Sequence, residues 1–262
     1  MSLDLRRQEV TRYIQPLREG GSLPLLAEAD DDFKYVVKMR GAGHGAKALV
    51  AELIGGEIAR RAGLRVPEQV LLHLGEEFGQ TEPDEEVQDL LKASRGLNLG
   101  IHFLSEAVTL DPYVNPIGAE EASAIVWTDA YLTNIDRTVK NTNMLLWHGE
   151  TWLIDHGASL YFHHSWRDFD KAAVSPFPYV RDHALLHKAS LLVETDRLMH
   201  SRITPAVITE IVDAVPQEWL IEEGRDMSPE EVRQVYRDFL TRRLEASETF
   251  VKQAVDARKS RI

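Results

Sequence analysis

A polar loop followed by a short hairpin pattern, at residues 134–157, constrains the fold of this chain more than any other segment. An apolar helical pattern at residues 120–132 leads into the loop, and two short strands joined by a turn at 148–150 follow it. Asp136 and Asn141 lie in the loop, and Asp155 ends the second strand. Because the loop directly precedes the hairpin, we expect these two carboxylates and one amide to converge.

Such a set of oxygen atoms has a specific chemistry. Mg²⁺ is usually held by one or two carboxylates together with substrate phosphates. A remaining carboxylate can orient or deprotonate a hydroxyl, and a base with amide and carboxylate metal ligands is what phosphoryl transfer requires. The alternative is that these residues only form turns, as Asp and Asn often do. The joint spacing favours a site formed by Asp136, Asn141 and Asp155.

Strand patterns precede this segment, and helical patterns follow it. Residues 1–117 mix short β-branched runs and glycine turns with one helix, at 47–62. Strands are expected in three segments, at residues 35–39, 69–74 and 97–104. An acidic stretch at 75–86 is typical of a solvated connecting loop. This order predicts an α+β fold with two unequal halves.

The C-terminal segment, residues 180–262, is predicted to form successive helices. Ser228-Pro229-Glu230-Glu231 has the pattern of a capping box with proline at the first helical position. The helix that starts there is expected to continue to about residue 258, as judged from its apolar spacing.

Composition and charge exclude several classes of protein. The 262 residues are 44% hydrophobic, which is enough for a full core. The absence of cysteine excludes a disulfide framework, a cysteine zinc site and a thiol nucleophile. A net charge of −12 argues against a nucleic-acid partner, because neutralising phosphates requires clustered Lys and Arg. Neither a signal segment nor an apolar run of membrane-spanning length is present, so we expect a cytoplasmic protein without a membrane partner.

Two motifs resemble those of known kinases. Asp136-Arg137-x-x-x-Asn141 followed by Ile154-Asp155-His156-Gly157 is similar to the catalytic loop and metal-binding turn of the protein-kinase-like fold, including phosphatidylinositol kinases. Over residues 20–166 the chain resembles the HipA-like kinase family of bacteria. The N-terminal segments that carry this resemblance are Gly20-Gly21-Ser22, Val36-Val37-Lys38, Glu52 and residues 62–68. The segment after about residue 178 has no matching motif.

The resemblance implies a two-lobed kinase-like fold that forms one domain. A small β-rich N-lobe would span residues 1–105, and a mostly helical C-lobe residues 106–262. It implies an ATP-dependent phosphotransferase that uses ATP and Mg²⁺, with a Ser/Thr hydroxyl of a protein as acceptor. Three alternatives stay open: a lipid or small-molecule acceptor, transfer of AMP, and a non-enzymatic nucleotide-binding regulator. The acceptor, any regulatory partner and the oligomeric state are left open.

The resemblance also implies a role for Lys38, which would contact the nucleotide phosphates. A carboxylate on the next helix orients such a lysine in kinases. Glu52 is the candidate, and Glu57 is the alternative on nearly the opposite side of the helix. From the residues alone, Lys38 could instead be an edge-strand lysine that extends to water.

The remaining predicted contacts with ATP lie in the N-terminal half and in the loop. Gly20, Gly21 and Ser22 could bring backbone N–H groups to a phosphate, although an ordinary turn is the alternative. Gly100, His102 and Phe103 lie where the segment joining the lobes is expected, and its backbone would bind adenine. Within the resemblance, Asp136 would be the catalytic base and Asn141 and Asp155 the Mg²⁺ ligands. Lys140 would neutralise charge on the transferring phosphoryl group, and Arg137 would brace the loop or bind a phosphate.

Overall fold

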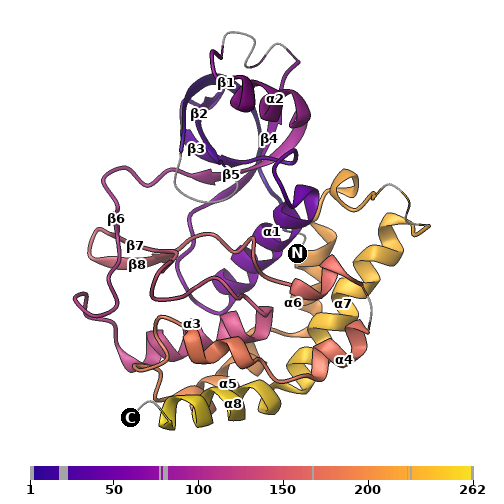
Figure 1. The fold of residues 1–262 in the computed structure, drawn as a ribbon. Helices are drawn as coiled ribbons and strands as arrows, with labels where there is room; N and C mark the ends of the chain where they lie inside the picture. Colours follow the sequence, from indigo (N-terminus) through magenta and orange to yellow (C-terminus); the bar gives the residue numbers. More distant parts are fainter. Residues whose placement is uncertain are drawn as a thin grey trace.

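The fold combines a β-barrel in the N-terminal part with helices in the later part (Figure 1). This computed structural model describes residues 3–17, 23–76, 78, 82–166, 168–222, 224 and 226–260. The barrel strands are β1 (Arg7–Pro16), β2 (Leu25–Ala29), β3 (Lys34–Lys38), β4 (Gln69–Leu74) and β5 (Gly96–His102). Their order is β1-β2-β3-β5-β4, and the parallel pairing of β1 with β4 closes the barrel.

The barrel has its own apolar interior, to which Leu25, Val37 and Leu72 belong. Closure pairs each strand on both sides, so β3 lies between β2 and β5. Lys38, at the end of β3, is therefore not on an edge strand, and its side chain is only 14% exposed.

Three elements within residues 1–105 were not predicted: strands β1 and β2 and one helix. Half of the residues of β1 are exposed, none is buried and most are polar, so this strand lacks the apolar run seen in the other barrel strands. Helix α2 (Glu85–Ala93) overlaps the expected loop at residues 75–86. Asp84 caps this helix by accepting hydrogen bonds from two backbone N–H groups, and Leu91 packs into the barrel cluster. The acidic residues at its start belong to a helical first turn, where negative charge is favourable.

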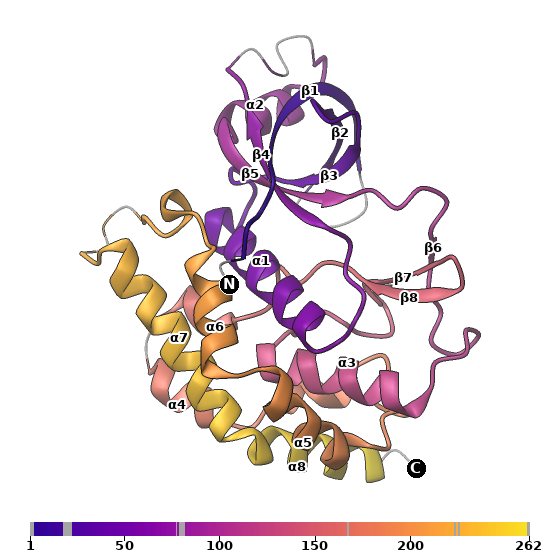
Figure 2. The same cartoon turned by 180° about the vertical axis from the view of Figure 1, so that it is seen from behind.

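Helix α1 (Gly45–Arg61) lies between the barrel and the later helices, as Figures 1 and 2 show. It contacts α3 (Ala119–Leu132) and α6 (Pro205–Asp213) on one side and β5 on the other. Its residues from Leu49 to Ala59 are all buried, which is typical of a helix covered on all sides.

A small sheet follows α3 and its polar loop. Strands β7 (Met144–Trp147) and β8 (Glu150–Leu153) form the expected hairpin, and β6 (Val108–Thr109) pairs with β7. His148 and Gly149 connect the hairpin with φ values of 50° and 79°. Two consecutive positive φ angles are the requirement of a type I′ turn, which matches the twist of the flanking strands.

The later part is helical, as expected, but one long helix is divided in two. Its elements are α4 (Phe169–Val174), α5 (Leu192–Arg202), α6, α7 (Pro229–Glu245) and α8 (Ser247–Lys259), with short 3₁₀ turns η1 (Tyr161–His164), η2 (Pro178–Asp182) and η3 (Gln217–Trp219). The predicted capping box at Ser228 is present. The prediction of one helix to residue 258 is wrong, because the chain turns at Ala246 and directs α8 onto α3 and α5.

No helix within the described ranges has both the length and the apolar character needed to cross a membrane.

Candidate functional site

The polar loop begins where α3 ends. Thr133 adopts a left-handed conformation with a φ of 56°, which turns the chain out of the helix. Asn134 then ties the loop back to α3, because its Nδ2 donates to Oδ1 of Asp129 at 2.9 Å. The Oδ1 of Asn134 accepts the backbone N–H of Asp136 at 3.1 Å. This arrangement sets the direction in which the Asp136 side chain leaves the loop.

The Asp136 carboxylate is held by two amides. Nδ2 of Asn141 donates to its Oδ2 at 2.7 Å, and Nδ2 of Asn143 donates to the same oxygen at 3.3 Å. Burial raises the pKa of Asp136, the two amide hydrogen bonds lower it, and the negative charge of Asp155 raises it. The net pKa is above its ordinary value. The charge of Asp155 therefore acts on Asp136, and the convergence of the two carboxylates with Asn141 stays a prediction.

A second group of charges joins the barrel, α1 and the turn after β8. Nζ of Lys38 lies 2.8 Å from Oδ1 of Asp155 and 3.7 Å from Oε2 of Glu52. The backbone N–H of His156 donates to the same Glu52 oxygen at 3.0 Å. Asp155 is in a left-handed conformation, with a φ of 57°, which short polar residues tolerate better than most. Three separate elements thus meet at the Lys38 ammonium group.

The pKa values follow from this contact. Burial alone would raise the pKa of Glu52, but the positive charge of Lys38 and the hydrogen bond from His156 outweigh it and lower the pKa to about 2. Burial alone would lower the pKa of Lys38, but the charges of Glu52 and Asp155 raise it above its ordinary value. Both groups are therefore ionised near neutral pH.

The structure distinguishes between the two candidate glutamates. Glu52 faces Lys38, whereas Glu57 forms a salt bridge with Arg60 on the same helix. The five-residue separation places them on nearly opposite sides of α1, as expected.

Arg137 is buried and does not lie on the surface of the loop. Only 1% of its surface is exposed, and its Nε donates to Oδ2 of Asp129 at 2.6 Å. Of the two predicted roles, bracing the loop therefore agrees with the geometry. Asp129 and its second partner, His183, were not singled out from the sequence. A carboxylate within the otherwise apolar helix at residues 120–132 was the available signal.

The other predicted site residues are more scattered. Lys140 is exposed on the loop. Gly100 lies in the middle of β5, where a Cβ would meet the Leu72 side chain at 2.5 Å. His102 ends β5, and the N–H of Phe103 donates to the carbonyl of Lys34 at 2.9 Å. The connection from the barrel to the later part starts only at Phe103. Gly20, Gly21 and Ser22 lie outside the described residues.

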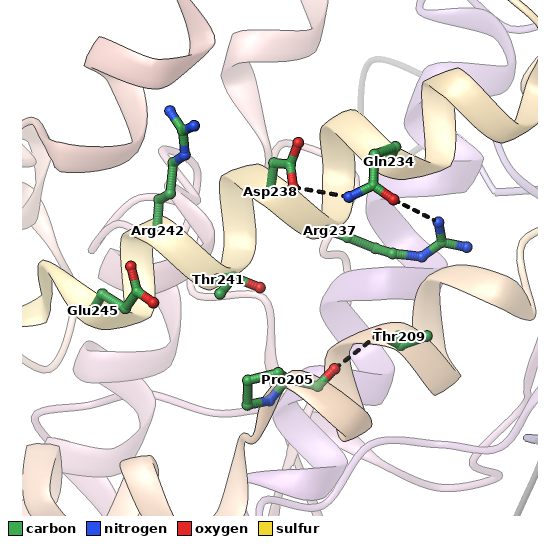
Figure 3. Close-up of a pocket in the computed structure, with 8 residues that line it drawn as sticks. All are labelled: Pro205, Thr209, Gln234, Arg237, Asp238, Thr241, Arg242 and Glu245. Atoms are coloured by element: carbon green, nitrogen blue, oxygen red, sulfur yellow. Dashed lines mark hydrogen bonds between the residues drawn. The ribbon is translucent and has the colours of Figure 1, made fainter.

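A hollow of about 540 Å³ lies elsewhere, between α6 and α7 (Figure 3). Its two arginines are engaged with neighbours: Arg237 pairs with Asp213 and Glu230, and Arg242 pairs with Asp170. None of its lining residues belongs to the predicted site.

The predicted metal ligands, Asn141 and Asp155, are too few to hold a metal ion by themselves, but they suit Mg²⁺ bound together with phosphates. Within the described part of the chain, no group of three or more His, Cys, Asp or Glu residues is arranged to hold a metal ion. Asn141 and Asp155 supply an amide and a carboxylate oxygen, and the Asp155 side chain is 40% exposed. Mg²⁺ commonly takes few protein ligands and completes its shell with phosphates and water. This donor set therefore fits a cation that arrives with a nucleotide.

Comparison with known proteins identifies the family of this chain. The profile of the HipA-like kinase family matches residues 10–252. The chain belongs to the HipA-like kinase family. The family prediction is confirmed, and the match extends well beyond residue 166 into the helices that carry no recognisable motif. Membership makes the chain a kinase-type phosphotransferase and implies the use of ATP.

A solved structure supports the fold independently. The chain is similar to the crystal structure of a proinflammatory kinase from Helicobacter pylori, CtkA, with a TM-score of 0.56 and 13% identity. The similarity covers 98% of this chain and 99% of that one. No curated protein matches the chain. At this identity the likeness shows a shared fold and does not assign site residues to this HipA-like kinase.

Proposed function

We propose that this HipA-like kinase transfers the γ-phosphoryl group of ATP to a hydroxyl group, and that the acceptor is a Ser or Thr of a protein. The observation that carries the proposal is the meeting of Lys38, Glu52 and Asp155 beside the loop that holds Asp136. ATP would bind between the barrel, as an N-lobe, and the helical part, as a C-lobe.

Each charged group has a proposed task. Glu52 holds the Lys38 ammonium in place, so that Lys38 can bind the phosphates of ATP. Asn141 and Asp155 would hold Mg²⁺, which neutralises charge on the phosphates when it is bound. In the structure Asp155 contacts Lys38 directly at 2.8 Å, so nucleotide binding would share Lys38 between the carboxylate and the phosphates.

Asp136 is proposed to position the acceptor hydroxyl and to take its proton. Both amide contacts fall on Oδ2, so within the described part of the chain Oδ1 has no hydrogen bond and can receive the acceptor. The hydroxyl oxygen forms a bond to the γ-phosphorus while the bond from that phosphorus to the bridging oxygen breaks. The proton passes to Asp136, and ADP leaves. The raised pKa of Asp136 favours its acceptance of this proton.

The remaining assignments extend the same proposal. Lys140, exposed on the loop four residues after Asp136, would neutralise charge on the transferring group. His102, which ends β5, and Phe103, which follows it, would lie beside adenine. Gly100 would act only by keeping β5 close to β4, because a side chain there would collide with Leu72.

The test is transfer from isotopically labelled ATP to protein acceptors in a lysate, with Asp136→Ala and Asp155→Ala beside the wild type. We expect each substitution to reduce transfer by at least about 10³-fold, since the base and a metal ligand act as a unit. Asp155→Ala should also weaken binding of Mg-ATP, measured by calorimetry, whereas Asp136→Ala should largely retain it. Unchanged transfer in both variants would contradict the proposal.

The mass of the modified product separates the alternatives. Phosphoryl transfer adds about 80 Da to the acceptor, and AMP transfer adds about 329 Da. A labelled lipid or metabolite with no labelled protein would identify another acceptor class. Binding of Mg-ATP with no transfer to any acceptor would identify a nucleotide-binding regulator.

A further inference from the structure

Three buried polar side chains meet beneath the polar loop. Asp129 comes from the last turns of α3, Arg137 from the loop itself, and His183 from the segment after η2. Their exposed fractions are 1%, 1% and 3%. Nε of Arg137 and Nε2 of His183 both contact Oδ2 of Asp129, at 2.6 and 2.9 Å. None of the three can touch a substrate directly, so any effect on the reaction passes through other groups.

The protonation of His183 follows from its partners. The backbone N–H of Leu185 donates to Nδ1 of His183 at 3.0 Å, so Nδ1 carries no proton. The proton therefore lies on Nε2, which donates to Asp129. Together with the amide of Asn134, the Asp129 carboxylate accepts hydrogen bonds from three side chains. Asp129 is thus the fixed centre of the cluster.

Arg137 links Asp129 to the polar loop and to the turn after β8. Its Nη1 donates to the backbone carbonyl of Asn143, and to that of Ile154 at 3.2 Å. Asn143 holds the carboxylate of Asp136, and Ile154 directly precedes Asp155. One guanidinium group therefore binds the backbone beside the proposed base and beside the proposed metal ligand.

The segment around His183 is also tied to the loop through the backbone. The N–H of Ala184 donates to the carbonyl of Arg137 at 3.1 Å, and Thr138 forms a β-bridge with His183. The loop is thereby held from below by side chains and from one edge by the main chain. A buried charge needs partners of this kind, because an unpaired one in this environment is strongly unfavourable.

We propose that His183 is a positioning residue, which acts through Asp129 and Arg137 to fix the separation between Asp136 and Asp155. The inference rests on the proposed function, since it assigns a purpose to the geometry of those two carboxylates. Loss of the cluster would slow transfer by misplacing them, and it would leave the Lys38–Glu52 contact with the nucleotide in place.

The principal test compares His183→Ala with His183→Gln, in which the amide nitrogen can replace the Nε2 donor. We expect Asp129→Asn and His183→Ala to lower kcat, by up to about 10²-fold, which a displacement of about 1 Å can cause. The Kd for Mg-ATP should change much less than kcat, because Lys38 and Glu52 keep their contact and Asp155 is displaced but not removed. His183→Gln should recover most of the lost kcat. Wild-type kcat in His183→Ala, or no recovery in His183→Gln, would overturn the inference.

Arg60 offers a matched control for Arg137. It pairs with the buried Glu57 and donates to the backbone carbonyls of Val66 and Pro67, at 3.1 and 3.0 Å. It is therefore also an arginine that joins a carboxylate to two carbonyl groups, but it does so away from the loop. Arg60→Lys should lower the melting temperature and keep kcat, whereas Arg137→Lys should lower both. An equal loss of kcat in the two variants would show that only stability matters.

A measurement without catalysis separates this inference from the proposed function. Amide hydrogen exchange in residues 134–143 and 154–157 should accelerate in Asp129→Asn, while exchange in the barrel strands stays unchanged. Unchanged exchange in the loop overturns the positioning role even in a protein that transfers no phosphate. A wild type that transfers nothing, with accelerated loop exchange in the variant, refutes the proposed function alone.

Discussion

Glu52 remains charged in a place that excludes water. Only 2% of its surface is exposed, yet its pKa is lowered to about 2, because Lys38 and His156 stabilise the carboxylate. A group whose pKa is lower in the folded state than in the unfolded chain stabilises the fold at pH values above its unfolded pKa. That stabilisation is lost as the pH falls toward the folded pKa. The Lys38–Glu52 pair therefore connects the proposed nucleotide site to the acid stability of the protein.

We predict that the wild type loses more free energy of unfolding than Glu52→Gln does when the pH falls from about 5 to about 3. The reason is that a glutamine at this position has no carboxylate to protonate. Urea unfolding at several pH values measures the difference, and comparing the two proteins cancels the titration of Asp129, whose pKa is also lowered. Parallel pH dependence in the two proteins would show that Glu52 contributes nothing to it.

At the scale of elements, the contact between α1 and the turn after β8 depends on a glycine. A Cβ at Gly55 would lie 2.6 Å from Cβ of His156 and 3.2 Å from its Cγ. The ring of His156 is fully buried against this point of the helix, and its backbone N–H binds Glu52. The absence of a side chain at Gly55 thus allows the turn that carries Asp155 to approach α1.

Gly55→Ala is predicted to destabilise the protein and to weaken binding of Mg-ATP. Alanine would normally stabilise a helix interior by about 1 kcal/mol relative to glycine. Here the collision with His156 dominates, and overpacking typically costs about 1–3 kcal/mol. Thermal unfolding and calorimetric titration with Mg-ATP measure the two effects.

Gly118→Ala is the control for this prediction. Gly118 precedes α3, has a negative φ, and has no atom within 4 Å of an added Cβ. It should lose about 1 kcal/mol or less, because alanine is a poorer N-cap than glycine but the added Cβ meets no other atom there. An increase in stability for Gly55→Ala, matching that of an ordinary helical glycine, would contradict the packing argument.

Local sequence patterns predicted the elements that have strong local causes. The strand at residues 69–74, the helix at 120–132 and the capping box at Ser228 match the structure within one residue. The break between α7 and α8 at Ala246 could not be predicted, because no proline or glycine marks it. The packing of α8 on α3 and α5 stabilises it. Strand β1 likewise forms because it pairs with β2 and β4, and not because of an apolar pattern of its own.

The site shows the same division. Lys38 and Glu52 could be named because they match the resemblance to the HipA-like kinase family, and Asp155 because it ends a recognisable hairpin strand. The structure brings Lys38 into contact with both carboxylates. His183 could not, because it meets Asp129 across 54 residues and follows a short 3₁₀ turn without periodicity. Such contacts depend on the packing of helices that local patterns do not describe.

At the scale of the whole molecule, one apolar cluster connects the barrel with the helices. Leu71 and Leu99 from the barrel, Leu53 from α1, and Phe239 from α7 belong to the same buried cluster. Among the described residues, the interior of the barrel forms a second, separate cluster. Shared burial of this kind links the unfolding of one part to that of the other.

We predict a single cooperative unfolding transition in scanning calorimetry. The calorimetric enthalpy should equal the van't Hoff enthalpy, as for one domain that unfolds in an all-or-none manner. Saturating Mg-ATP should move the whole transition to higher temperature, because the ligand binds only the folded state. Two resolved transitions, with only one of them shifted by the nucleotide, would refute this prediction.

The enclosed position of α1 has a consequence for regulation. Many kinases are switched off by rotating the helix that carries this glutamate, which withdraws the carboxylate from the lysine. Here that helix is wedged between the barrel and the bundle, so rotating it would open the interior to solvent. An inhibitor of this kinase, whether a natural antagonist or a designed compound, would have to block the proposed ATP site between the barrel and the helices. It would leave the contact between Lys38 and Glu52 intact.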